Sequence, residues 1–369
     1  MFVEYDKRYL SLLLLFFFFF FFSPDCYLVE SKDTFIWYAP FYSGGGYSSE
    51  AQSFALSIHQ QLLLVPFNNN SITSSFNRPD FYINQHGDTP KSSYLKSLRK
   101  NERDLFLSID FQLDNKEITL MHSYNKTSDY IVAICHSEPG AWDAPYPFYY
   151  TSSCPPSYAD IRIGRTMFET DQLPEGWENR INTMHEVWVP TEFAKDIFIK
   201  AGVNKRKIVV VPEPVDTEFF QPRNLSDLSL SQVKNRNLRK VFETAMILPH
   251  RKFTFLFVGK WETRKQLKLL LRAFFKEFGG TSVTTTMSNV QLAVLTSQYH
   301  STSDFKKEII KEIKSNNDLH IYEPFVDESV IVLSSVPQKY MPFLYSAVDI
   351  LVILVLVIIM IMYMYSCCF

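Results

Sequence analysis

The chain has 369 residues, and one hydrophobic core rarely grows past roughly 250 residues before a chain divides, so we expect two lobes. Hydrophobic residues make up 46% and charged residues 21%, with 37 Lys and Arg against 39 Asp and Glu. This balance excludes a disordered or fibrous protein and offers no basic surface for nucleic acid. The five cysteines include no C-x-x-C pair, so neither a disulfide scaffold nor a thiolate zinc site is expected, and at most one or two disulfides could form.

The N-terminus carries an uninterrupted apolar run at residues 12–22, preceded by Lys7 and Arg8. It fits the hydrophobic region of a signal peptide and is shorter than the about 20 residues of a membrane span. We therefore expect residues 1–23 to be a signal peptide, or an uncleaved signal anchor because no small-x-small cleavage motif follows. The body would then lie in the lumen of the endoplasmic reticulum or Golgi, with N-x-S/T glycan acceptors at Asn69, Asn125 and Asn224.

Apolar runs with strand character alternate with helical patterns along the rest of the chain. The first unit is a strand at 35–38, then a glycine turn and a helix at about 49–63, which is the first β-loop-α of a nucleotide-type fold. Further strands are expected at 130–135, 187–189, 208–211, 253–258, 290–295, 329–333 and from residue 350. Strands that alternate with helices predict parallel α/β sheets.

One helix can be bounded at both ends from the sequence. Thr191 is the expected N-cap and Gly202 lies just past the end. Its expected apolar face is formed by Phe193, Ala194, Ile197, Phe198 and Ala201. The following polar segment, 223–240, has no strong period and separates two series of strands, so we interpret it as a linker.

The C-terminal residues 350–365 are apolar and uncharged. The first six or seven of them fit a buried parallel strand, because β-branched residues dominate. The whole run, 16 to 20 residues depending on where it is ended, borders on a membrane span. Both alternatives remain open, and membrane contact through either terminus is an expectation.

Two loops at predicted strand ends carry candidate site residues in the first half of the chain. Glycine turns let backbone N–H groups approach phosphates, and Gly44, Gly45 and Gly46 precede a helix as such a site requires; a plain turn is the alternative. The third glycine of G-x-G-x-x-G is absent, which disfavours a dinucleotide. His136 follows a strand at the ligand edge of the sheet, where a purely structural histidine is the alternative.

The loop after the predicted strand 253–258 is basic, with Lys260, Arg264 and Lys265. Cations in a βα loop can neutralise a diphosphate leaving group, although a solvated basic loop is the alternative. The sequence has no G-x-x-x-x-G-K-[ST], H-E-x-x-H or G-x-S-x-G motif. It also has no D-x-D pair, so we expect no metal site of the kind used by single-sheet nucleotide-sugar enzymes.

Seven stretches together resemble the plant glycosyltransferases of the GT-B fold, in the retaining, glycogen-synthase-like superfamily. They are APFYSGGGYSSEA, ICHSEPGAW, GRTMFETDQLPEGWENRIN, EVWVPTEFAKDIF, KIVVVPEPVDTEFFQP, KWETRK and LTSQYHSTSDF. The resemblance covers roughly residues 34 to 349. It implies two facing Rossmann-like lobes, with an acceptor lobe at 34–222 and a donor lobe at 241–349. The implied partners are a nucleotide sugar and an acceptor of unknown class (glycan, protein or small molecule), without a further cofactor.

The resemblance also implies roles for the candidate residues. Gly44, Gly45 and Gly46 would approach the donor phosphate and the acceptor, with Arg264 as a further nucleotide-binding residue. His136 would touch the donor sugar. Lys260 and Lys265 would offset the charge of the departing nucleoside diphosphate. These three are the implied catalytic residues, and the implied reaction is hexosyl transfer.

The sequence departs from the family at three places. Gln266 stands where the family has glycine, and His185 where it has aspartate. After residue 352 the family continues into a helix with two donor-binding glutamates, which this chain lacks. We therefore expect an incomplete second lobe, a non-family tail at 350–369 and impaired transfer. The alternatives are a non-catalytic membrane-associated binding protein and a truncated gene-model product.

Overall fold

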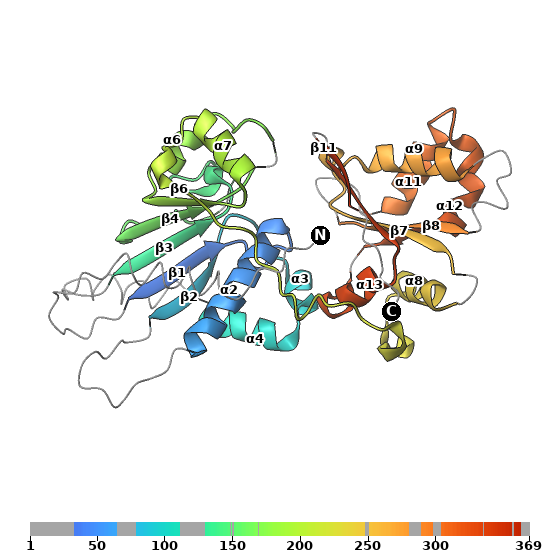
Figure 1. Ribbon diagram of the computed structural model, residues 1–369, viewed down its shortest axis with the longest axis horizontal. Coiled ribbons are helices and arrows are strands. Elements are labelled where there is room, and N and C mark those ends of the chain that lie inside the picture. Colours follow the sequence, from blue (N-terminus) through green and yellow to red (C-terminus); the bar gives the residue numbers. More distant parts are fainter. Residues whose placement is uncertain are drawn as a thin grey trace.

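The computed structural model describes residues 33–64, 79–110, 130–147, 149, 151–168, 170–247, 251–279, 289–297, 304–334, 336–355 and 358–362. They form two α/β lobes joined by one extended crossing of the chain (Figure 1). The predicted signal segment 1–23 and the sequons at Asn69 and Asn125 lie outside the described residues.

The first lobe is built on a six-stranded parallel sheet in the order β2-β1-β3-β4-β5-β6. Its strands are β1 (Thr34–Ala39), β2 (Asp80–Gln85), β3 (Ile131–His136), β4 (Ile161–Arg165), β5 (Glu186–Val189) and β6 (Ile208–Val210). Its helices are α2 (Gly46–Leu64), α3 (Ser92–Ser97), α4 (Lys100–Ile109), α6 (Trp177–Asn182) and α7 (Glu192–Lys200). The strand order reverses between β1 and β3, and open α/β sheets bind ligands at such a point, outside the carboxyl ends of the strands.

Both faces of this sheet are buried, since successive strand residues point to opposite sides. Ile36 and Tyr38 of β1 join the core beneath α6 and α7, whereas Trp37 and Ala39 join the core with α2 and α4. Figure 1 shows these two helical layers on opposite faces of the strands. The predicted parallel α/β architecture is thus confirmed for this lobe.

Helix α7 begins and ends as predicted. The Thr191 hydroxyl accepts a hydrogen bond from the Ala194 amide, and Gly202, with φ of +98°, ends the helix in the left-handed conformation. Phe193 is a correction, because its side chain is 57% exposed. At 3.6 residues per turn it lies about 90° from the centre of the buried face formed by Ala194, Ile197 and Phe198.

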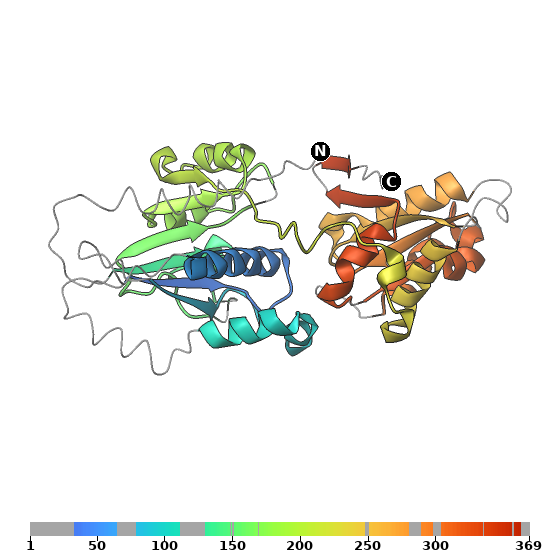
Figure 2. The same cartoon turned by 60° about the horizontal axis from the view of Figure 1, so that its bottom comes forward.

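The second lobe has a sheet in the order β11-β10-β7-β8-β9, in which only β11 runs antiparallel (Figure 2). Its strands are β7 (Phe253–Val258), β8 (Val290–Leu295), β9 (Val330–Leu333), β10 (Ile350–Val355) and β11 (Ile358–Met362). Its helices are α8 (Arg236–Met246), α9 (Leu267–Phe278), α11 (Phe305–Lys314), α12 (Val326–Ser329) and α13 (Met341–Ser346). The order of the parallel strands reverses between β7 and β10, so a second candidate ligand edge lies at the end of β7.

The run at 350–365 begins as a strand, one of the two predicted alternatives. Ile350 and Val352 pair with Phe255 and Phe257 of β7, and the chain then returns as β11. No helix among the described residues is both long enough and apolar enough to cross a bilayer.

The segment 223–240, interpreted as a linker, packs against the second lobe. Val233 and Leu238 are fully buried in one core with residues of β7, β8 and β9. The apolar residues of α8 that face this core recur at helical spacing from Leu238 onward. Most of them lie after residue 240, outside the segment that was interpreted as a linker.

The crossing between the lobes is held at both ends. On the first lobe, the Arg99 guanidinium lies 3.2 Å from the Asp216 carboxylate and 4.1 Å from the centre of the Phe219 ring. On the second lobe, the amide of Arg223 donates to the Ser346 hydroxyl at 2.8 Å. These contacts set how the two ligand edges face each other.

Candidate active site

The two ligand edges approach each other at Gly45 and Lys260. A β-carbon added to Gly45 would lie 3.6 Å from the Lys260 Nζ. Gly45 belongs to the loop after β1, and Lys260 to the loop after β7. The structure therefore brings together two of the residues that the sequence analysis assigned to one site.

The glycine loop has the geometry of an anion site. Gly44 has a φ of +77°, and a β-carbon there would meet the Tyr94 ring at 2.8 Å, so only glycine fits. Helix α2 begins directly afterwards at Gly46 and has no acidic residue in its first turn. The N–H groups of the first helical turn and the positive end of the helix dipole therefore meet here, which favours a phosphate.

His136 lies behind this loop and not on its surface. Its side chain is 0% exposed; Nδ1 accepts a hydrogen bond from the Trp37 indole at 3.1 Å, and Nε2 lies 3.0 Å from the Glu50 carboxylate. The Tyr47 and Phe54 rings contact its edges. Both ring nitrogens are thus engaged inside the protein, and the donor-sugar contact implied by the resemblance is not available to His136 in this structure.

A buried ion pair completes the group around His136. Arg165, at the end of β4, donates from Nε to Glu50 Oε1 at 2.8 Å and from a terminal nitrogen to the Val211 carbonyl. Burial alone would raise the Glu50 pKa, but the hydrogen bond from His136 and the Arg165 charge together lower it. Burial lowers the His136 pKa. Glu50 is therefore ionised and His136 neutral near pH 7.

Neither Glu50 nor Arg165 was among the site residues predicted from the sequence. Both stand in quoted motifs, YSSEA and GRTMFETD, and both are charged residues within otherwise apolar or small surroundings. This pattern could have predicted that the two residues interact, because a charged side chain at a strand end or on the core-facing side of a helix needs a partner of opposite charge.

The basic loop of the second lobe turns sharply after β7. The amides of Gly259 and Trp261 donate to the carbonyls of Leu295 and Ser297, which ties the loop to the end of β8. Lys265 Cγ would lie 3.6 Å from a β-carbon on Gly259, so Lys265 folds back along the same loop. The Arg264 side chain lies outside the described part of the structure, so its predicted role stays a prediction.

Gln266 is the one non-glycine residue with positive φ, at 51°, in the part of the chain that the structure describes. This position ends the short helix 263–265 and precedes α9, and a glycine there would avoid the strain of a β-carbon. We expect Gln266→Gly to be more stable than Gln266→Ala by about 1 kcal/mol, the reverse of the usual helix ranking. Urea unfolding of the two variants measures this, and an Ala variant at least as stable as the Gly variant would contradict it.

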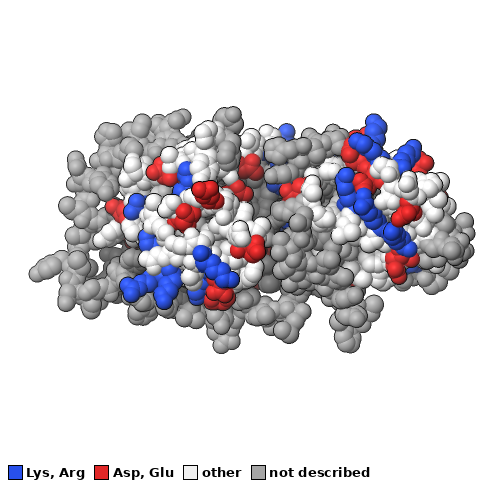
Figure 3. All heavy atoms as spheres, turned by 90° about the horizontal axis from the view of Figure 1, so that it is seen from above, with Lys and Arg blue, Asp and Glu red and all other residues white. Residues whose placement is uncertain are grey.

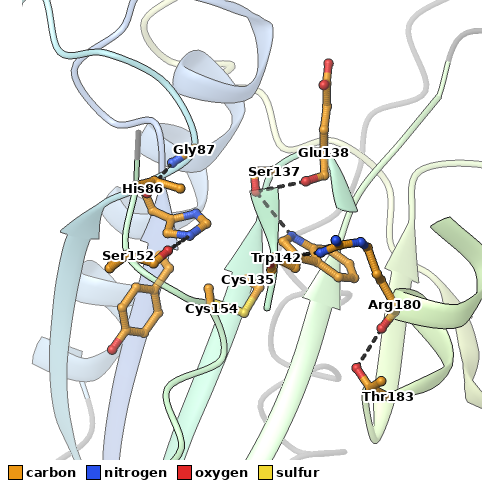
Figure 4. The surroundings of a disulfide bond; sticks show 12 residues. His86, Gly87, Cys135, Ser137, Glu138, Trp142, Ser152, Cys154, Arg180 and Thr183 are labelled. Atoms are coloured by element: carbon orange, nitrogen blue, oxygen red, sulfur yellow. Dashed lines mark hydrogen bonds between the residues drawn. A yellow bond between two sulfur atoms is a disulfide. The ribbon is translucent and has the colours of Figure 1, made fainter. Parts of the chain in front are cut away.

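A disulfide fastens the segment that follows His136. Cys135 of β3 is bonded to Cys154, and Figure 4 shows the bond between the end of β3 and the returning chain. His86 Nε2 contacts the Ser152 carbonyl at 2.9 Å, and Arg180 donates to the Trp142 carbonyl from the other side (Figure 4). The segment is thereby held against β2, β3 and α6.

The side chain of Glu138 extends away from the strand ends in this segment (Figure 4). It is half-buried, and the Tyr149 hydroxyl donates to its carboxylate. In this it differs from Glu50, whose carboxylate is enclosed.

The surface seen in Figure 3 mixes both signs of charge on each lobe. On the second lobe, Lys268 and Arg272 of α9 both pair with Glu312 of α11, at 2.9 and 2.7 Å. Among the residues described, no group of three His, Cys, Asp or Glu side chains is placed to hold a metal ion.

No model of a protein family matches this sequence, and a search of curated proteins found none that matches. Solved structures do match. The Anabaena protein Alr3699/HepE in complex with UDP and glucose superposes with a TM-score of 0.52 at 13% identity, covering 87% of this chain and 73% of that one. The same protein with UDP-glucose gives a TM-score of 0.51 at 14% identity over 86% and 72% of the two chains.

The chain has the GT-B glycosyltransferase fold. At this identity the likeness concerns the fold alone. It confirms the fold class predicted from the sequence, two Rossmann-like α/β lobes, and leaves the roles of the individual residues to the geometry described above.

Proposed function

We propose that this protein is a GT-B glycosyltransferase that binds a nucleotide sugar between its lobes and transfers the hexose to an acceptor on the first lobe. The observation that carries the proposal is the approach of Lys260 to Gly45. A diphosphate placed there would meet the amides of the glycine loop on one side and an ammonium group on the other. The fold's occurrence in a protein solved with UDP-glucose supports this choice of ligand.

In this proposal the leaving nucleoside diphosphate is stabilised by the chain's own cations. Negative charge grows on the leaving oxygen during the transfer, and groups that bind it better in the transition state accelerate the step. Lys260 faces the glycine loop, and Lys265 lies in the same loop of the second lobe. In this proposal Glu138, whose side chain extends away from the end of β3, contacts acceptor hydroxyls.

We further propose that donor binding is weak. The resemblance places two donor-binding glutamates on a helix after the strand that corresponds to β10, and here β10 is followed by the antiparallel strand β11. If each lost contact is worth about 1.5–3 kcal/mol, affinity falls by more than about a hundredfold.

Calorimetric titration with UDP tests both proposals. We expect the unaltered chain to bind UDP with a dissociation constant above about 100 μM. A variant with Lys260→Ala and Lys265→Ala should bind at least about tenfold more weakly, because two cations near the diphosphate are gone. Lys276→Ala on α9 is a matched control and should leave binding unchanged.

Two results would contradict these expectations. Micromolar UDP binding would show that the donor site is complete. Absence of binding at about 10 mM UDP would favour the alternative, a non-catalytic binding protein that keeps only the acceptor side.

We also propose that the protein matures in the secretory pathway. The apolar segment near the N-terminus supports this, and so does the Cys135–Cys154 disulfide, because such bonds persist mainly in oxidising compartments. Asn224, in one of the three sequons, is exposed.

A further inference from the structure

One carboxylate, that of Glu50, connects the helix behind the glycine loop to three strand ends. Glu50 is the fifth residue of α2, which begins at Gly46. Its Oε2 contacts His136 at the end of β3, and its Oε1 contacts Arg165 at the end of β4. Arg165 also holds the Val211 carbonyl just after β6. The first turns of α2 are thus tied to the ligand edge of the sheet.

The hydrogen bonds around residue 50 require a side chain that accepts on both of its polar atoms, as a carboxylate does and an amide does not. The Trp37 indole can only donate, so the His136 Nδ1 that faces it must be unprotonated. The proton of neutral His136 is then on Nε2 and requires an acceptor at Glu50. Arg165 is likewise a pure donor. Glu50 therefore receives donors on both oxygens, and an amide in its place would set two donors against each other.

We propose that Glu50 is a positioning residue of the glycine loop: through His136 and Arg165 it holds the start of α2, and hence Gly44, Gly45 and Gly46, in the conformation that faces Lys260. This inference rests on the proposed function only in assuming that the glycine loop binds the diphosphate. Glu50 itself touches no substrate, since its side chain is 4% exposed.

The variant Glu50→Gln tests this in the full chain. The introduced amide can keep its oxygen on Arg165 only by turning its NH₂ toward His136, which forces the imidazole proton onto Nδ1 and against the Trp37 indole. We expect the ¹⁵N spectrum of His136 to change from the Nε2–H to the Nδ1–H form. The Ser49 amide donates to the Gly45 carbonyl at 3.1 Å and so reports on the start of α2. Its hydrogen exchange should become at least about tenfold faster, while exchange in β5 and α7 stays the same.

Two further variants make the test specific. Adding Trp37→Phe to Glu50→Gln removes the opposing donor, so the Ser49 amide should recover part of its protection. Glu186→Gln is the matched control, because Glu186 also accepts from an indole, that of Trp188, but lies at the start of β5. It should leave the glycine loop unchanged.

Exchange that is unaffected in Glu50→Gln, or that rises equally throughout the first lobe, would overturn the proposal. If Glu50→Gln does not fold, Glu50→Asp is the second variant. Its shorter carboxylate keeps the His136 tautomer but should speed exchange of the Ser49 amide, and unchanged exchange there would again overturn the proposal. These readouts need no nucleotide. Failure of the unaltered chain to bind UDP would therefore reject the proposed donor site without deciding the role of Glu50.

Discussion

Replacing Arg165 by methionine should lower the free energy of unfolding by about 3–5 kcal/mol, because it leaves the buried Glu50 carboxylate without its counter-charge. Both side chains are almost entirely enclosed, so water cannot take over the lost interaction. Urea unfolding followed by tryptophan fluorescence measures the change. A loss under about 1 kcal/mol would contradict the expectation that this pair is a buried, energetically coupled one.

The pH dependence of stability gives an independent readout of the same pair. Glu50 has a lowered pKa in the folded protein, so its stabilising contribution is present above the ordinary carboxyl pKa and is lost as pH falls through the folded value. In Arg165→Met the Glu50 pKa should rise, and this part of the acid destabilisation should shrink. Adding Glu50→Met to Arg165→Met should recover stability, since the uncompensated charge is then removed.

Removing the Cys135–Cys154 disulfide is the second change expected to have a large effect. The bond links residues 19 apart, and loop-closure entropy for a loop of that size corresponds to about 3 kcal/mol. Cys135→Ala with Cys154→Ala should therefore unfold at lower urea, and the segment 137–154 should become more sensitive to proteolysis. Adding reductant to the unaltered protein should produce a similar loss.

The alanine pair supplies the control for that experiment, because reductant should not affect it. Stability of the unaltered protein that is the same with and without reductant would contradict the prediction. Thiol trapping in expressing cells extends the test to the proposed compartment: the two cysteines should be found oxidised, as in a protein of the secretory pathway.

Local patterns in the sequence were sufficient for much of the fold. The predicted strands 253–258 and 290–295 have the bounds of β7 and β8, since each is a mainly apolar run, with Thr254 or Gln291 as its one polar residue. Helix α7 was bounded by its own cap residues, Thr191 and Gly202. Strands β2 and β4 were missed, because Asn84 interrupts the apolar pattern of β2 and Arg162 that of β4.

The sequence by itself determined the alternation of strands and helices and the two lobes, because short-range pattern and resemblance carry that information. The assignment of Gly45 and Lys260 to one site stays a prediction, although the structure brings the two residues together. Only the tertiary structure decided that His136 is enclosed, that Ile350 begins a strand paired with β7, and that Glu50 meets Arg165 across 115 residues. The physical reason is that a charged or polar residue has the same local sequence signature whether it is solvated or buried. Its role depends on which distant donor or acceptor the fold places against it.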